Sequence, residues 1–117
     1  MATKNTEATR YYSNNQEAKI SKEIGATRTP NSGAGKFRKG DLIHREASLL
    51  VEAKCCMSDK SSFSIKKDWI IKNKDETFSQ GLSNGCIAFD FGPGQDIYYV
   101  INTRLMKYLI EKLSEEE

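Results

Sequence analysis

Two carboxylates and an amine are the residues of this chain with the clearest chemical potential. Asp41 follows Gly40, and Glu52 and Lys54 lie in an apolar run that begins at Leu49. Because side chains alternate along a β-strand, Glu52 and Lys54 would share one face of that strand. Two carboxylates can hold a hard divalent cation, and a neighbouring ammonium can steady an attacking water or the charge of a phosphorane. The pattern therefore predicts metal-dependent phosphodiester cleavage.

The surrounding periodicity predicts a small α/β domain, with a central mixed β-sheet flanked by helices. Four segments have the apolar composition of strands, and the first two of them form a hairpin: residues 42–43, 48–54, 86–91 and 97–101. Three segments have the periodicity and end signals of helices: residues 13 or 14 to 24, about 65 to 80, and 102 or 103 to about 113. The second helix is predicted to turn four apolar residues toward the core: Ile65, Trp69, Ile70 and Phe78.

The length of the chain suits one domain with a single core. We expect a flexible arm over residues 1–13, the domain over residues 14–113 and an acidic tail over residues 114–117. No segment has the length and hydrophobicity of a membrane span, and the first residues lack the apolar stretch of a signal peptide, so we expect a cytoplasmic protein. The spacing of the three cysteines suits neither a disulfide framework nor a metal site, and we expect reduced thiols with Cys86 in the core.

Charge is distributed unevenly along the chain, although the net charge is only +2. Residues 1–74 contain 15 Lys and Arg against 8 Asp and Glu, whereas residues 75–117 contain 3 against 8. The basic part includes the carboxylates and the amine described above. Such a surface suits a polyanion such as DNA. Charge alone leaves open the alternative that these residues only solvate an ordinary surface.

Four features occur in a recognisable order: Glu17 in the first helix, the small-residue loop from Arg28 to Gly33, Gly40-Asp41, and Val51-Glu52-Ala53-Lys54. This order resembles the Holliday junction resolvases of the PD-(D/E)xK nuclease superfamily, a family with archaeal members and phage relatives. Two later runs, residues 62–69 and 88–93, are most similar to the phage or prophage branch. The resemblance covers residues 14–113. Gly40 stands where the superfamily name has proline, a position that supplies no ligand.

The resemblance implies a restriction-endonuclease-like fold and a magnesium-dependent endonuclease that nicks four-way or other branched DNA in recombination and repair, inside a bacterial host cell. Asp41 and Glu52 would ligate Mg²⁺, with Mn²⁺ able to replace it. The backbone carbonyl of Ala53 would be a further ligand, and Glu17 would help directly or through water. Lys54 would orient the attacking water and offset the growing negative charge.

The resemblance also implies which residues contact DNA: Arg28, Thr29, Asn31, Ser32, Gly33, Lys36, Arg38, Lys39, Lys66 and Lys67. It implies a homodimer as well, because a twofold pair can present two active sites to two strands of a junction. No membrane partner and no small-molecule substrate are expected. The first helix contains a second carboxylate, Glu23, as the alternative to Glu17, although the spacing to Ile20 and Gly25 favours Glu17.

Each of these features has a simpler explanation. A Glu-x-Lys triplet occurs often as a surface ion pair, and only its combination with the aspartate, the helix glutamate and the loop favours a nuclease. Trp69 is expected to pack in the core rather than stack on a base, and His44 to be an ordinary hairpin residue. Two other functions remain open, a repair or restriction-type nuclease of the same superfamily and a basic DNA-binding protein that does not cleave. Dependence on a divalent metal separates both kinds of nuclease from the DNA-binding protein that does not cleave.

Overall fold

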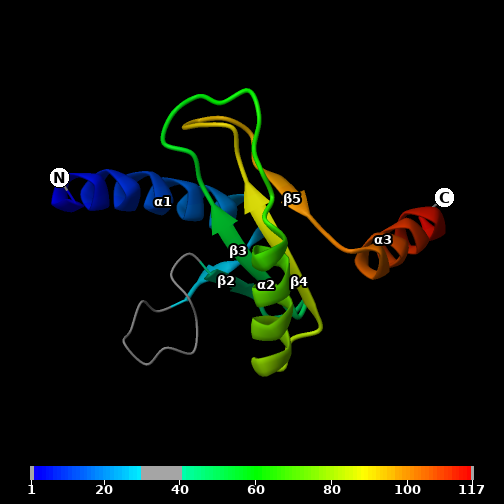
Figure 1. The fold of residues 1–117 in the computed structure, drawn as a ribbon. Coiled ribbons are helices and arrows are strands. Elements are labelled where there is room, and N and C mark those ends of the chain that lie inside the picture. The colour runs from blue at the N-terminus through cyan, green and yellow to red at the C-terminus, as the bar shows by residue number, and fades with distance from the viewer. Residues whose placement is uncertain (1, 30–40, 117) are drawn as a thin grey trace.

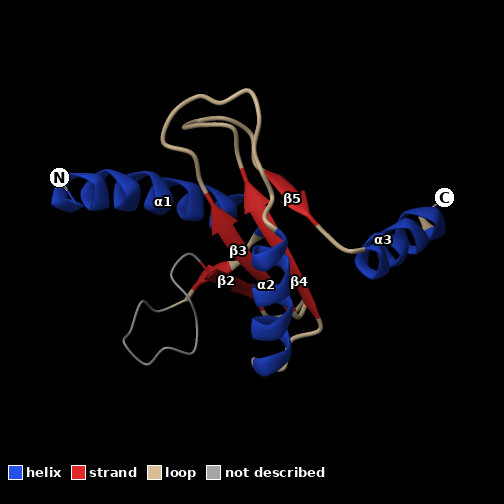
Figure 2. Ribbon diagram, viewed as in Figure 1, coloured by secondary structure: helices blue, strands red, loops and turns tan. Residues whose placement is uncertain are grey.

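The computed structural model describes residues 2–29 and 41–116, with side chains from residue 9 onward. Eight elements follow one another: α1 (Ala2–Ile24), β1 (Thr27–Arg28), β2 (Asp41–His44), β3 (Leu49–Lys54), α2 (Lys67–Ser79), β4 (Asn84–Phe89), β5 (Tyr98–Val100) and α3 (Thr103–Glu115). The strands form one sheet in the order β1-β2-β3-β4-β5, with β3 and β4 parallel and the other neighbours antiparallel. Figures 1 and 2 show helices around this mixed sheet, which confirms the predicted α/β class.

Helix α2 makes the connection that a parallel strand pair requires, between the end of β3 and the start of β4 (Figure 1). Its buried residues are Asn73 and Thr77, and Asn73 Nδ2 donates a hydrogen bond of 3.2 Å to the carbonyl of Cys86. The helix can approach β4 this closely because Gly85 has no side chain. A Cβ atom there would lie 2.3 Å from Asn73 Oδ1 and 2.4 Å from Thr77 Oγ1.

The buried side of α2 is therefore not the apolar side that the periodicity predicts. Ile70 is exposed and Phe78 is 86% exposed, whereas Trp69 is partly buried. Ile65 is also partly buried but precedes the helix. The prediction was wrong because the glycine on β4 admits small polar side chains that bond to the strand backbone, and larger apolar side chains would not fit there.

Helix α1 begins earlier than predicted. Regular helix was expected only from residue 13 or 14, but α1 starts at Ala2 and continues until Gly25, which has φ +78°. The sequence contains neither glycine nor proline between these two residues, so nothing in the backbone interrupts the helix. The structured part of the chain thus includes most of the segment that was predicted to be irregular.

The core lies between the second half of α1 and one face of the sheet. Its buried members come from α1, the following turn and alternate strand positions: Ile20, Ala26, Leu42, Val51, Cys86 and Ala88. The prediction that Cys86 is a core residue is confirmed, and all three cysteines are free thiols. Residues at the intervening strand positions face α2 instead. Within residues 2–29 and 41–116, no helix combines the length and hydrophobicity needed to cross a membrane.

Candidate active site

Asp41 and Glu52 lie directly opposite each other on neighbouring antiparallel strands, β2 and β3. Opposing residues in such a pair extend from the same face of the sheet, with Cα atoms roughly 4.5–5.5 Å apart. Both side chains are buried, Asp41 at 1% exposure and Glu52 at 3%. Burying two carboxylates at opposing positions is unfavourable for folding, because like charges repel and each loses hydration. Packing alone gives no reason for this pair.

The carboxylate pair faces helix α2. Leu50 pairs with Gly85 in the ladder between β3 and β4, and Gly85 lies against the buried side of α2. Glu52 is two residues beyond Leu50 and therefore extends from the same face. The α2 face of the sheet thus changes from apolar at Leu50 to charged at Glu52 within one strand.

Lys54 joins the carboxylates on this face. Its Nζ atom lies 3.0 Å from Glu52 Oε2, and its side chain is 29% exposed. The same Nζ atom lies 4.4 Å from the ring centroid of Trp69 in α2. The ammonium is therefore held between a carboxylate and an aromatic face. Alternation along β3 places Glu52 and Lys54 on one face, and antiparallel pairing with β2 adds Asp41.

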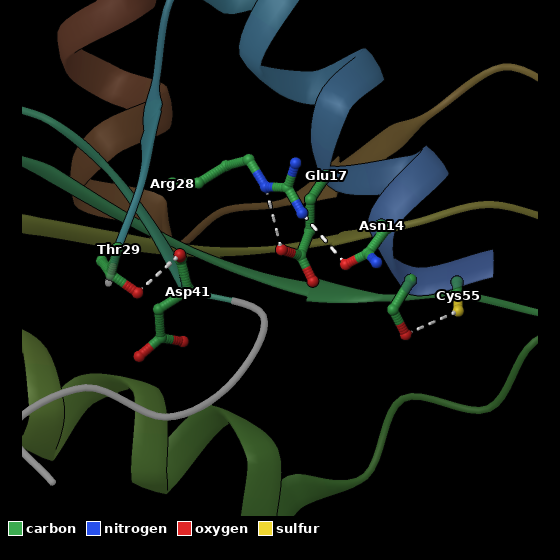
Figure 3. Close-up of polar contacts among 7 residues, drawn as sticks. Asn14, Glu17, Arg28, Thr29, Asp41 and Cys55 are labelled. Carbon is green, nitrogen blue, oxygen red and sulfur yellow. Dashed lines mark hydrogen bonds and ion pairs between the residues drawn. The ribbon is translucent and has the colours of Figure 1, made fainter. Parts of the chain in front are cut away.

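Glu17 belongs to a different pair. It is buried, and its Oε1 atom lies 3.4 Å from Nε of Arg28, whose Nη2 donates a hydrogen bond of 3.0 Å to Asn14 Oδ1. Arg28 is the ladder partner of Leu42, so it extends from the face that α1 covers. Figure 3 shows the Asp41 carboxylate pointing away from the Glu17–Arg28 pair. In the part of the chain that the structure describes, no three His, Cys, Asp or Glu side chains are grouped closely enough to hold a metal.

The alternative carboxylate, Glu23, is exposed on α1. It lies near Tyr99 of β5, whose pKa is raised to about 12, chiefly by burial and further by Cys86 and Glu23. β5 is the far edge of the sheet from β2 and β3. Of the two glutamates, Glu17 thus lies nearer to Asp41, because its partner Arg28 belongs to β1, the strand next to β2.

A buried polar network, which inspection of the sequence missed, fixes the end of β3. Gln16 Nε2 donates to the carbonyl of Lys54 at 2.7 Å and to Asp90 Oδ2 at 3.1 Å. Asp90 Oδ1 in turn accepts from the backbone amides of Cys56 at 3.3 Å and Gly92 at 3.1 Å. An aspartate two residues before a glycine is a turn signal that could have identified Asp90. Gln16 had no such signal, because its partners lie far away in the sequence.

The predicted DNA-binding residues that the structure describes lie at two places. Thr29 is bonded to the strand itself, since its amide donates to the carbonyl of Asp41 at 3.2 Å. Its hydroxyl donates to the same carbonyl at 3.1 Å (Figure 3). Lys66 and Lys67 are exposed at the start of α2, and Lys66 Nζ lies 5.6 Å from the ring centroid of Trp69. The other predicted contacts lie outside the described residues: Asn31, Ser32, Gly33, Lys36, Arg38 and Lys39.

The donor set on the α2 face suits magnesium. Mg²⁺ prefers oxygen ligands, keeps several waters and is usually held by one or two protein carboxylates together with phosphate oxygens. Asp41 and Glu52 meet this requirement without a third carboxylate. Ala53, whose carbonyl is the further predicted ligand, lies between Glu52 and Lys54 and is partly buried.

The remaining reactive side chains have structural partners. Burial, followed by the charge of Asp90, raises the pKa of the Cys56 thiol, which disfavours the nucleophilic thiolate. Cys55 Sγ lies 3.6 Å from Ser13 Oγ (Figure 3). His44 Nδ1 accepts a hydrogen bond of 3.2 Å from the amide of Ala47, as expected for an ordinary hairpin residue. Neither a thiol nor an imidazole therefore competes with the carboxylates as the centre of chemistry.

Comparison with known proteins finds no matching family model, no matching curated protein and no matching solved structure. Membership of the resolvase family thus stays a prediction from the order of the motifs.

Proposed function

We propose that this chain is a metal-dependent DNA endonuclease with Asp41, Glu52 and Lys54 in its active site. The observation that carries the proposal is the opposing placement of two buried carboxylates, with Lys54 Nζ 3.0 Å from one of them. Their burial is unfavourable for the fold by itself but useful for binding a cation. The overall basic character of residues 1–74 supports a polyanionic substrate.

In the proposed mechanism, Asp41 and Glu52 would hold Mg²⁺ on the α2 side of the sheet. The ion would supply polarisation of the scissile phosphate and a more nucleophilic water at neutral pH. Lys54 would then be less tightly engaged by Glu52. Its ammonium then orients the attacking water and offsets the negative charge that develops during in-line attack. Trp69 limits the positions that the ammonium can take.

The proposed substrate is branched DNA, with the four-way junction as the first choice. Support comes from the order of the helix glutamate, the small-residue loop and the Asp…Glu-x-Lys motif, which resembles that of the junction resolvases. A β-strand, helix, β-strand crossover directly after the motif is compatible with that resemblance. A nuclease for duplex DNA and a DNA-binding protein without cleavage are the two competing proposals.

One experiment separates these three functions. The chain is incubated with a labelled four-way junction, a Y-structure and a linear duplex of equal length, with Mg²⁺ or with a chelator. Asp41→Asn and Lys54→Ala are compared with Asp75→Asn, a matched change of an exposed carboxylate on α2. We expect metal-dependent, symmetric nicks in the junction alone, and a loss of at least about 1,000-fold in cleavage for Asp41→Asn. DNA binding by Asp41→Asn should persist, since a negative charge is removed from a basic surface.

The other outcomes are equally informative. Similar cutting of all three substrates would mean a general nuclease, whereas binding without any metal-dependent cutting would overturn the enzymatic proposal.

Thermal unfolding gives a readout that needs no DNA. Mg²⁺ or Mn²⁺ should raise the unfolding temperature of the unmodified chain and of Asp75→Asn but not of Asp41→Asn, because only a bound cation stabilises the folded state.

A further inference from the structure

Helix α3 stands apart from the rest of the molecule. Figure 1 shows it beyond β5, at the opposite end of the molecule from the N-terminus of α1. None of its residues is buried, although it is strongly amphipathic. Its apolar residues occupy one side of the helix: Leu105, Met106, Tyr108, Leu109, Ile110 and Leu113. A continuous apolar surface of this kind on a folded protein marks an interaction site.

The start of α3 is nevertheless firmly held. Of the two residues at which the sequence allows this helix to be capped, Asn102 and Thr103, Asn102 is the N-cap, and its Oδ1 atom accepts a hydrogen bond of 2.9 Å from the amide of Leu105. Arg104 Nη2 donates to the carbonyl of Ser83 and, at 3.4 Å, to Asn84 Oδ1 at the start of β4. The exposed apolar side is therefore presented in a defined direction.

The apolar side of α3 has two edges with different surroundings. Leu105, Tyr108 and Leu109 line a cavity of about 700 Å³, whose sheet side includes Leu49 and Tyr99. The second edge lies outside that lining and consists of Met106, Ile110 and Leu113, at 47%, 53% and 66% exposure. These three residues follow the i, i+4, i+7 spacing of a helix–helix contact. The second edge is therefore apolar, aligned and uncovered.

The charges of α3 indicate what covers this edge. Its first half contains the basic residues Arg104 and Lys107, whereas its second half contains Glu111 and Glu115 with one base, Lys112, and is followed by Glu116 at the C-cap. In an antiparallel pair of such helices, the basic half of each lies beside the acidic half of the other, and the helix dipoles also oppose each other favourably. A parallel pair would bring like charges together. The helix is thus complementary to a second copy of itself about a twofold axis.

We propose that two copies of this chain associate through an antiparallel pairing of their α3 helices. Met106, Ile110 and Leu113 of each copy form the contact, and the partner helix shields the adjoining groove between α3 and the sheet. The proposal is independent of the proposed nuclease chemistry. A twofold dimer would also supply the paired active sites that symmetric nicking of a junction requires.

Sedimentation velocity of the full chain tests the contact. We expect a dimer for the unmodified chain and a dissociation constant at least about 100-fold higher for the double variant Ile110→Ser with Leu113→Ser. Asp68→Ser with Lys72→Ser is the matched control, since it replaces an exposed ion pair of α2 by two serines with no change in net charge, and it should remain dimeric. Circular dichroism establishes that both variants keep their helices. A monomeric unmodified chain at about 100 µM, or an Ile110–Leu113 variant that dimerises like the control, would overturn the proposal.

Cysteine cross-linking tests the orientation. A Met106→Cys chain is mixed with a Leu113→Cys chain of different mass and oxidised, and linked peptides are identified by mass spectrometry, which separates them from links to the native cysteines. Antiparallel helices should give links between the two different chains, whereas links only between identical chains would refute this orientation. A monomer that still cleaves would refute the self-association alone. A dimer without metal-dependent cleavage would refute the nuclease alone.

Discussion

Consecutive residues of β3 point to opposite faces of the sheet and meet opposite environments. Val51 is fully buried beside Cys86 in the apolar core under α1, whereas Glu52 is almost equally buried on the α2 face opposite Asp41. Burial of a valine side chain stabilises a fold by about 1.5–3 kcal/mol. Burial of a carboxylate costs its hydration, and the ion pair of Glu52 with Lys54 at 3.0 Å offsets part of that cost. The α1 face of the strand therefore maintains the fold, whereas the α2 face has buried charges whose grouping a function can explain.

The largest effect is expected on the charged face. Glu52→Gln should lower metal-dependent cleavage by at least about 1,000-fold, because a neutral amide binds a hard cation poorly. In chelator, its unfolding temperature should change little, because the loss of repulsion from Asp41 and the loss of the 3.0 Å ion pair with Lys54 act in opposite directions. Cleavage rates and thermal scans in chelator measure both quantities. If Glu52→Gln lost stability and kept most of its activity, the contrast between the two faces would be wrong.

The neighbouring residue should behave in the opposite way. Val51→Ala deletes buried methyl groups from the core and should lower the free energy of unfolding by about 2 kcal/mol. Its cleavage activity per folded molecule should stay unchanged. Urea denaturation gives the stability, and cleavage at a temperature well below the transition gives the activity. A selective loss of activity in Val51→Ala would show that the two faces are not separable.

The apolar face should also make the free energy of unfolding depend on pH. Burial raises the pKa of Cys86 to about 12 from an ordinary value of 9.0. The folded chain therefore keeps this proton at a pH where the unfolded chain releases it, so the associated stability is present below pH 9 and is lost as the pH rises toward 12. Denaturation between pH 9 and 10, below the range in which Tyr99 contributes, should show a decline of up to about 1.4 kcal/mol per pH unit that Cys86→Ala lacks. Cys55→Ala, at a partly buried site, should retain the decline; an equal decline in all three chains would contradict the assignment.

The smallest effect is expected at the aromatic partner of Lys54. Trp69→Leu removes the ring that lies 4.4 Å from Nζ, an interaction of about 0.5–1 kcal/mol, and should slow cleavage by about two- to fivefold. Because the tryptophan positions the ammonium, the loss should appear in kcat more than in KM. Phe78→Leu changes an exposed aromatic residue of the same helix and should leave both constants unaltered. Equal losses in the two variants would indicate a general effect of α2 on stability.

The sequence by itself determined the local part of the site. Alternation along β3 puts Glu52 and Lys54 on one face, and a short hairpin places Asp41 opposite Glu52, because both relations depend on backbone geometry over a few residues. The start signal of α3 was equally local: the sequence limited the N-cap to Asn102 or Thr103, and the structure has Asn102.

Only the tertiary structure decided which distant residues support the site. The bonds of Gln16 to Lys54 and Asp90, and the contact of Trp69 with Lys54, join segments that no local pattern relates. The buried side of α2 was mispredicted for the same reason: Gly85 on the facing strand decides which side chains fit beneath the helix. Periodicity shows which side of a helix or strand is apolar. Whether that side is buried depends equally on the shape and size of the residues in the neighbouring element.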